Sequence, residues 1–213
     1  MEKCVIYGAG TYGEVYAAYL KNQYEVLGFI DDNPKIIGAS INGYSVLGNS
    51  EFLFSELDKT ISVFVPIGNN EVRVSLLEKL EHEGFLTPSF VHRDTLIDTS
   101  VIIGKGVYIL PSTSIMPFTI IGKYTMISMG VNIAHHVVIE KGCFFSQGTN
   151  VGAAINIREQ AYCGIGSTIM TGVKELGVKS FIGAGAVIIK DVADGATVVG
   201  NPGRIIKSTS KLE

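Results

Sequence analysis

A six-residue period governs the second half of the chain. Every sixth residue from Ile97 to Ile169 is apolar. In a chain with 46% hydrophobic residues, a run of this length in any register would arise by chance on the order of once in 4,000 sequences. The residues that share this position are Ile97, Ile103, Ile109, Ile115, Ile121, Ile127, Ile133, Ile139, Phe145, Val151, Ile157, Cys163 and Ile169.

A second position, four residues later in each unit, carries only small or β-branched residues. Its members are Val101, Val107, Thr113, Thr119, Thr125, Val131, Val137, Cys143, Thr149, Ile155, Ala161, Ser167 and Val173. A period of six does not match an α-helix, and β-branched residues favour short strands joined by turns. Three units close a triangular coil of about 18 residues, and stacked coils bury the aliphatic column as one core. The sequence therefore predicts a parallel β-helix of about five coils between Ile97 and Lys190.

One irregularity interrupts this period. From Ile169 to Leu176 the step is seven residues rather than six, after which Ile182 and Ile188 resume the count. An extra residue in one strand or corner is accommodated by a bulge or a longer turn. We expect that feature near Glu175.

The first part of the chain lacks the six-residue period and alternates between strands and helices. An apolar strand at 3–7 is followed by a glycine-rich turn at 8–13 and a helix to about Lys21. Further strands are expected at 25–30 and 61–66, and a helix at 71–83. This order predicts a small Rossmann-like βαβ domain with a parallel sheet. We therefore expect two domains, residues 1–92 and residues 93–213.

The turn Gly8-Ala9-Gly10-Thr11-Tyr12-Gly13 resembles the G-x-G-x-x-G fingerprint of dinucleotide-binding folds. There, glycines let a phosphate approach backbone amides at the start of a helix, and an acidic residue follows about 20 positions on. Asp31 and Asp32 stand at that distance. Glycines also serve merely to close strand-to-helix turns. A domain of about 90 residues is half of a complete dinucleotide fold, which favours a single nucleotide over a redox cofactor.

Composition excludes some classes of function. The chain has 17 Lys and Arg against 20 Asp and Glu, a net charge of -3, so it has no basic field for general nucleic-acid binding. No apolar stretch reaches the roughly 18 residues of a membrane span, and no secretion signal is recognisable. We expect a cytoplasmic protein without a membrane span. Three cysteines, Cys4, Cys143 and Cys163, lie among apolar neighbours and are expected to be buried thiols.

Two adjacent histidines are the candidates for chemistry. His135 and His136 occupy the third and fourth positions of a unit and can face outward, whereas His82 and His92 read as solvated or structural. Ala153, one coil of 18 residues later, should lie about 4.8 Å from His135 along the axis. Small residues there place main-chain amides beside a base, as acyl transfer requires. An incidental surface pair and a tight corner of small residues remain the alternatives.

The hexad pattern resembles the hexapeptide-repeat acyltransferases, which form left-handed β-helices. Across essentially its whole length the chain resembles bacterial nucleotide-sugar acetyltransferases that make N-acetylated 4-amino-4,6-dideoxy sugars, of the perosamine and bacillosamine type, and their sialic-acid O-acetyltransferase relatives. Besides the hexads, the segments that carry this resemblance are Gly8 to Gly13, Phe29-Ile30-Asp31-Asp32-Asn33, Ile67-Gly68-Asn69-Asn70 and Val199-Gly200-Asn201-Pro202-Gly203-Arg204.

The resemblance implies roles for individual residues, a homotrimer, no metal, and a place in surface glycan synthesis such as lipopolysaccharide O-antigen. His135 matches the catalytic base. The residues that match the nucleotide-sugar site are Gly8, Gly10, Thr11, Tyr12, Gly13, Asp31, Asp32 and Asn69. The residues that match the acetyl-CoA site are Gly152, Ala153, Ile165, Ala184 and Pro202.

The chain departs from the family pattern at three positions. Tyr12 stands where many members have histidine, His136 where several have an acidic residue that orients the base, and Phe144 where a second histidine is common. The second departure removes the obvious orienting partner of His135.

Acetyl transfer from acetyl-CoA to the amine of a nucleotide-linked sugar is the leading hypothesis. Transfer to a hydroxyl, as in sialic-acid O-acetylation, would use the same residues. A zinc hydratase needs three ligands on successive turns, which the adjacent histidines do not provide. A nicotinamide oxidoreductase rests on the glycine turn alone, and a non-catalytic scaffold is the remaining alternative.

Overall fold

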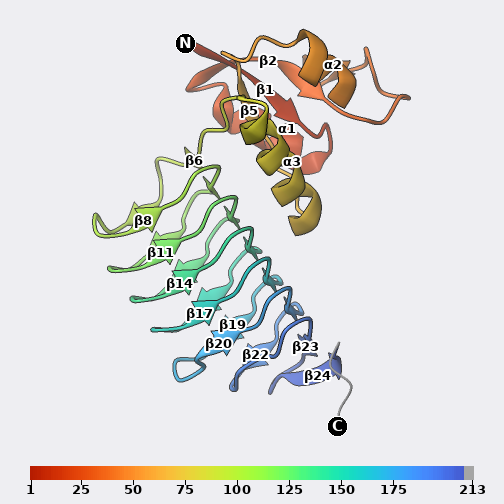
Figure 1. Cartoon of the computed structure of the whole chain (residues 1–213). Coiled ribbons are helices and arrows are strands. Elements are labelled where there is room, and N and C mark those ends of the chain that lie inside the picture. The colour runs from red at the N-terminus through yellow and green to blue at the C-terminus, as the bar shows by residue number, and fades with distance from the viewer. Residues whose placement is uncertain (209–213) are drawn as a thin grey trace. The chain divides into compact units, whose positions relative to one another are not determined.

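The computed structural model describes residues 1–208 and comprises two compact units, Met1–Pro88 and Ser89 onward (Figure 1). Each unit has its own sheets and its own buried core. Among the described residues, no helix combines the length and the apolar character needed to cross a bilayer. Cys4, Cys143 and Cys163 are buried free thiols, as expected.

The first unit is built on a five-stranded sheet with strand order β3-β4-β2-β1-β5. The strands are β1 (Glu2–Tyr7), β2 (Tyr24–Ile30), β3 (Ser40–Ile41), β4 (Tyr44–Gly48) and β5 (Ser62–Phe64). β1 pairs in parallel with β2 and β5, so the βαβ order predicted from the sequence is confirmed. The sequence analysis missed β3 and β4, which form a short antiparallel pair around Asn42 and Gly43, two residues at positive φ.

Three helices complete the first unit: α1 (Thr11–Leu20), α2 (Ser50–Glu56) and α3 (Asn70–His82). α1 and α3 were expected, whereas the short α2 was not. Asn49 and Asn69 cap α2 and α3, because each side-chain oxygen accepts a backbone N–H two or three residues into the helix, at 3.1 Å. Arg73 of α3 is fully buried and donates to the carbonyl of Ile67. That bond ties α3 to the loop after β5.

The second unit is a left-handed parallel β-helix with three faces, in which two-residue strands stack one coil above another (Figure 1). The first face consists of β6 (Phe90–Val91), β9 (Tyr108–Ile109), β12 (Met126–Ile127), β15 (Phe144–Phe145), β18 (Tyr162–Cys163), β21 (Phe181–Ile182), β23 (Thr197–Val199) and the antiparallel β24 (Arg204–Lys207). The second face consists of β7 (Leu96–Ile97), β10 (Ser114–Ile115), β13 (Asn132–Ile133), β16 (Asn150–Val151), β19 (Thr168–Ile169) and β22 (Val187–Ile188). The third face consists of β8 (Ile102–Ile103), β11 (Ile120–Ile121), β14 (Val138–Ile139), β17 (Asn156–Ile157) and β20 (Glu175–Leu176).

The aliphatic column predicted from the sequence is the core of this β-helix. Equivalent residues pair one coil apart, as Ile133 does with Val151 and Ile139 with Ile157. Ile127, Phe145 and Ile157 have no measurable exposed surface. Each such side chain contributes about 1.5–3 kcal/mol relative to exposure, which offsets the entropy of ordering many short strands.

The seven-residue step is a longer corner, as predicted. Asn156 pairs with Glu175, 19 residues later, whereas regular partners are 18 residues apart. The extra residue lies between β19 and β20, where Gly172 has a φ of 104° and Thr171 and Val173 form an isolated bridge. After this corner the coils continue in register, with Ile169 paired to Ile188.

Candidate active site

His135 and His136 form the corner between β13 on the second face and β14 on the third. His136 has a φ of 57°, in the left-handed region that turns the chain there, and histidine tolerates this region better than most residues. Its N–H donates to the Pro117 carbonyl one coil earlier, at 3.2 Å. Both histidine side chains are exposed. The outward orientation expected from the hexad positions is therefore confirmed.

The two rings are held against each other. Nδ1 of His135 lies 3.0 Å from Nδ1 of His136, and the rings are nearly perpendicular at 89°. One of these nitrogens must carry the proton and the other must accept it. The other neighbour of the His136 ring is Phe118, with ring centroids 4.9 Å apart. His136 thus supplies a partner for His135 at the position where the sequence offered no carboxylate.

Ala153 stacks on His135, as the 18-residue spacing predicted. Asn132 pairs with Asn150 at the start of the two corners, and the Ala154 N–H donates to the His135 carbonyl at 3.0 Å. The Ala153 N–H donates to the hydroxyl Oγ1 of Thr171, which belongs to the next coil, at 3.2 Å. His135, Ala153 and Thr171 therefore occupy the same corner in three successive coils.

Gly152 directly follows β16 and is required there by close packing. Its N–H donates to the Ile169 carbonyl at 2.8 Å, so this amide is already used by the sheet hydrogen bonds. A Cβ at this position would lie 2.4 Å from the backbone nitrogen of Thr171. Of the two amides considered from the sequence, only that of Ala153 lies outside the backbone sheet pairing.

A cleft of about 420 Å³ runs along the second face beside this corner. Gly152, Met170 and Thr171 line it, together with the outward side chains of β13 and β16. Asn132 donates through Nδ2 to Oδ1 of Asn150 at 3.0 Å, so the floor of the cleft carries an amide ladder. The cleft offers polar groups along the coils and ends at the His135 column.

Two further residues predicted to contact acetyl-CoA lie elsewhere. Ile165 and Ala184 are exposed at the corner between the first and second faces, on β18-to-β19 and β21-to-β22 turns, whereas His135 lies at the corner between the second and third faces. Within one chain the structure does not bring them to His135.

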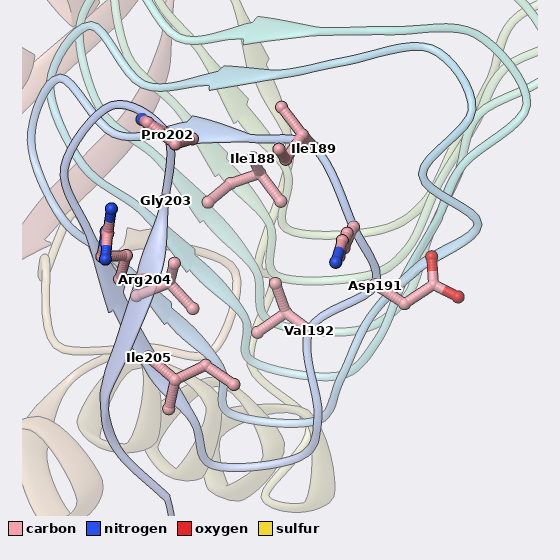
Figure 2. Close-up of a pocket in the computed structure, with 10 residues that line it drawn as sticks. Ile188, Ile189, Asp191, Val192, Pro202, Gly203, Arg204 and Ile205 are labelled. Atoms are coloured by element: carbon pink, nitrogen blue, oxygen red, sulfur yellow. The ribbon is translucent and has the colours of Figure 1, made fainter.

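Pro202 lines a separate pocket of about 420 Å³ near the last coils. Figure 2 shows Ile188, Val192 and Ile205 between Arg204 on one side and Asp191 on the other. The pocket combines an apolar centre with the cations of Lys190 and Arg204.

The first unit contains its own cleft, of about 550 Å³, at the carboxyl ends of β1 and β2. Its lining residues are Tyr7, Gly8, Asp31, Asp32, Ile67, Glu71, Val72, Ser75 and Leu76. Gly8 and the acidic pair, which the sequence placed in one site, are thus brought together. Ligands bind at this end of the strands in open α/β sheets.

The acidic pair also holds loops in place. Asp31 accepts the N–H groups of Ala9 and Asn33, at 2.8 and 2.9 Å. Asp32 accepts the Tyr7 hydroxyl and the Ser50 N–H, the latter at 2.7 Å. Tyr7 is therefore a member of this site that the sequence analysis missed.

These contacts set the ionisation of Asp32 and Tyr7. Burial acts to raise the pKa of Asp32, but the hydrogen bonds from Tyr7 and Ser50 and the charge of Lys79 outweigh it, so the pKa is lowered. Burial, followed by the bond to Asp32, raises the pKa of the Tyr7 phenol. Asp32 is thus kept as a carboxylate facing the cleft.

The glycine loop divides into open and packed positions. Gly10 has no atom within 4 Å of where a Cβ would stand, and Thr11, exposed, begins α1. Gly13 is buried, and a Cβ there would lie 2.0 Å from the Gly8 carbonyl oxygen. Gly13 is therefore required by the packing of α1 against the loop.

Tyr12 and Asn69 flank this loop. The ring of Tyr12 lies 3.8 Å from the Cβ position of Gly68, in the loop after β5. Asn69 uses its side-chain oxygen to cap α3.

Histidines outside the corner serve other purposes. His82 is exposed on α3 beside Glu83, and Nδ1 of His92 accepts the Asp94 N–H at 3.2 Å. Within residues 1–208 no group of three metal-ligating side chains comes together. Thr171 and Phe118 were missed by the sequence analysis, although each stands a multiple of 18 residues from a histidine of the pair.

Comparison with known proteins identifies the family to which this fold and site belong. Residues 3–80 match the family model described as the PglD N-terminal domain. WeeI from Acinetobacter baumannii is 30% identical, with a TM-score of 0.89 over 97% of this chain and 100% of that chain. This chain belongs to the hexapeptide-repeat nucleotide-sugar N-acetyltransferases. It is therefore an acyltransferase, and the resemblance inferred from its hexads and loops is confirmed.

Two other members of the family were solved with ligands. The acetyltransferase domain of PglB from Neisseria gonorrhoeae, in complex with acetyl coenzyme A, is 28% identical with a TM-score of 0.88 over 96% of this chain and 99% of that chain. PerB from Caulobacter crescentus, in complex with CoA and GDP-perosamine, is 25% identical with a TM-score of 0.89 over 97% of this chain and 98% of that chain.

Proposed function

We propose that this protein transfers the acetyl group of acetyl-CoA to the 4-amine of a nucleotide-linked 4-amino-4,6-dideoxy sugar, with His135 as the base. The observation that carries the proposal is the exposed His135 ring, held at Nδ1 by His136 and stacked beside the Ala153 corner. A relative of the same length and fold binds CoA and GDP-perosamine.

The reaction follows from this arrangement. When His135 carries its proton on Nδ1 and donates a hydrogen bond from it to Nδ1 of His136, the Nε2 atom of His135 carries the free lone pair. The amine attacks the thioester carbonyl, its proton passes to Nε2, and the carbonyl oxygen becomes an oxyanion that needs a donor. The carbonyl then re-forms, the C–S bond breaks, and the His135 imidazolium returns the proton to the CoA thiolate.

The two substrates would use different units. The cleft of the first unit, with Gly8, Asp31 and Asp32, suits the nucleotide part of the sugar acceptor. The open space at Gly10 and the start of α1 suit a diphosphate. The cleft on the second face suits the pantetheine arm, and the pocket at Pro202 suits the adenosine end.

We also propose a homotrimer. Ile165 and Ala184, matched to the acetyl-CoA site, lie at a different corner from His135, so a second copy is needed to bring them to it. Leu96, Ile102 and Phe118 are 60% or more exposed, an apolar surface that association would cover. Light scattering should give three times 22.8 kDa, and a monomer mass would contradict the trimer.

Mixed oligomers give a sharper test. A chain with His135→Ala and a chain with Ile165→Asp should each be inactive, and co-refolded mixtures should recover part of the activity if the two residues meet across subunits. Mixtures that stay as inactive as the separate chains would contradict shared sites.

The activity is tested by incubating the protein with acetyl-CoA and a panel of nucleotide-linked amino sugars, and by mass spectrometry of the products. Matched acceptors with a hydroxyl in place of the amine, and free sialic acid, separate N-acetylation from O-acetylation. An acetylated product that resists mild alkali supports the amide. Product only with hydroxyl acceptors would favour O-acetylation.

We place the reaction in the cytoplasm, in the synthesis of surface glycans.

A further inference from the structure

The corner that contains Thr171 differs from the two corners that precede it in its column, those of His135–His136 and Ala153–Ala154. In those two corners the residue in the left-handed position donates its N–H to a carbonyl one coil earlier, as His136 does to Pro117 and Ala154 to His135. In the earlier corner of the column, the Phe118 N–H donates to Oγ of Ser100. In the part of the chain that the structure describes, Gly172 forms no such bond to the Ala153 carbonyl. The extra residue of the seven-residue unit changes the path of the chain at this point.

This changed path places a hydroxyl on the Ala153 amide. Thr171 Oγ1 accepts the Ala153 N–H at 3.2 Å. Its side chain is exposed and lines the cleft of the second face. Insertions in strands often re-aim a side chain next to an active site, and the seven-residue unit lies two coils after His135.

The bond to Thr171 determines which group can donate to a ligand. The Ala153 N–H has one hydrogen, and it points to Oγ1. A hydroxyl that accepts a hydrogen bond keeps its own hydrogen for a further partner, and accepting from an amide polarises it as a donor. The free donor at this corner is therefore the Thr171 O–H.

The column also has the spacing that the reaction needs. His135 and Thr171 are separated by two coil spacings, about 9.6 Å, and the residue between them is alanine. Its side chain is only a methyl group, so no bulky side chain stands between the base in one coil and the hydroxyl donor two coils on. A tetrahedral carbon between them would present its nitrogen to His135 and its oxygen to Thr171.

We propose that the Thr171 hydroxyl is a catalytic residue that donates a hydrogen bond to the oxyanion of the tetrahedral intermediate, an inference that rests on the proposed acetyl transfer. Attack forms the C–N bond and moves the carbonyl π electrons to oxygen, where the Thr171 O–H holds the charge. Collapse returns these electrons, breaks the C–S bond and releases the thiolate, which takes the amine proton from His135. Thr171 itself gains and loses no proton.

The test compares Thr171→Val, Thr171→Ser and Thr99→Val in steady-state acetyl transfer. Valine keeps the shape and removes the hydroxyl, so kcat should fall about 100- to 1,000-fold, the usual loss for one oxyanion donor, with little change in KM for acetyl-CoA. Serine should keep kcat within about 10-fold, because the donor remains. Thr99 is exposed at the same corner two coils before His135, so Thr99→Val should match the wild type.

Two results would overturn this role. A Thr171→Val protein with kcat equal to or above that of the wild type would assign the oxyanion to the freed Ala153 amide. Equal losses in Thr171→Val and Thr171→Ser would make the side chain a packing element. Failure of the proposed function itself is recognised separately, because the wild type would then acetylate no acceptor on the panel and release no CoA. Failure of the Thr171 role alone would show only in the variants of an active wild type.

Discussion

Nδ1 of His135 lies 3.0 Å from Nδ1 of His136. If both nitrogens carried a proton, the two N–H groups would repel each other at this distance. The pair therefore works with one proton between the two Nδ1 atoms. When that proton sits on His135, its Nε2 is left as a base directed to solvent. In the proposed mechanism, His136 takes the positioning role for which the sequence offers no acidic residue.

Removing the base should be the most damaging change at this corner. His135→Ala should lower kcat about 100- to 10,000-fold, the range for loss of a general base. The fold should be retained because the side chain is exposed. His82→Ala, on the surface of α3, is the matched control and should leave kcat unchanged. Full activity in His135→Ala would show that the base lies elsewhere.

If His136 positions His135, two substitutions at position 136 should have different effects on kcat. His136→Asn keeps an acceptor near the place of Nδ1 and tolerates the positive φ, whereas His136→Ala removes the acceptor. We expect a loss in kcat of about 10- to 100-fold for alanine, smaller than that for the base, and a smaller one for asparagine. Rate-against-pH profiles should shift only for alanine. Equal effects of both variants would reduce His136 to a structural corner residue.

The glycine loop yields a pair of opposed outcomes. Gly10→Val should fold, because no atom lies within 4 Å of the new Cβ, but should weaken nucleotide-sugar binding while acetyl-CoA binding persists. Gly13→Ala should destabilise the first unit, because its Cβ would overlap the Gly8 carbonyl oxygen. Circular dichroism and calorimetric titration with each ligand measure both. Gly10→Val with normal nucleotide-sugar affinity would exclude the loop from the site.

Asp32 links stability to pH. The pKa of Asp32 is lowered in the folded protein, so its carboxylate contributes stability above the unfolded-state pKa near 3.8, and this contribution is lost as pH falls through the lower folded-state pKa. Tyr7→Phe removes one hydrogen bond to Asp32 and should lower Tm at neutral pH more than at pH 3. Because Asp32 is mostly exposed, we expect a modest change. An equal Tm difference at both pH values would contradict the linkage.

The aliphatic column should dominate the stability of the β-helix. Ile157 has no exposed surface, and Ile157→Ala should cost about 2–5 kcal/mol of unfolding free energy through lost burial and a cavity. Asn156, its exposed neighbour on β17, is the control, and Asn156→Ala should change stability by less than about 0.5 kcal/mol. Urea denaturation measures both, and similar values for the two variants would contradict the assignment of the core.

The six-residue period determined most of the second unit. One apolar residue every six positions is buried when three short strands close a coil and the coils stack. The stacking of Ile133 on Val151 and of His135 beside Ala153 therefore followed from counting by 18. The βαβ order and the meeting of Gly8 with Asp31 and Asp32 followed from strand ends that share one edge of a parallel sheet. The hairpin of β3 and β4 was not predicted, because strands of two and five residues are too short to show a clear period.

Only the tertiary structure decided which atoms are available for chemistry. The sequence predicts backbone amides of Gly152 and Ala153 beside the base. In the structure the Gly152 N–H donates to a carbonyl of the next strand in the sheet, and the Ala153 N–H donates to the Thr171 hydroxyl. The sequence shows two histidines, but ring orientations decide that they face each other. A sequence repeat predicts which backbone positions stack in successive coils. Which atom donates a hydrogen bond and which accepts it depends on side-chain conformation, and that conformation is set by neighbours in three dimensions.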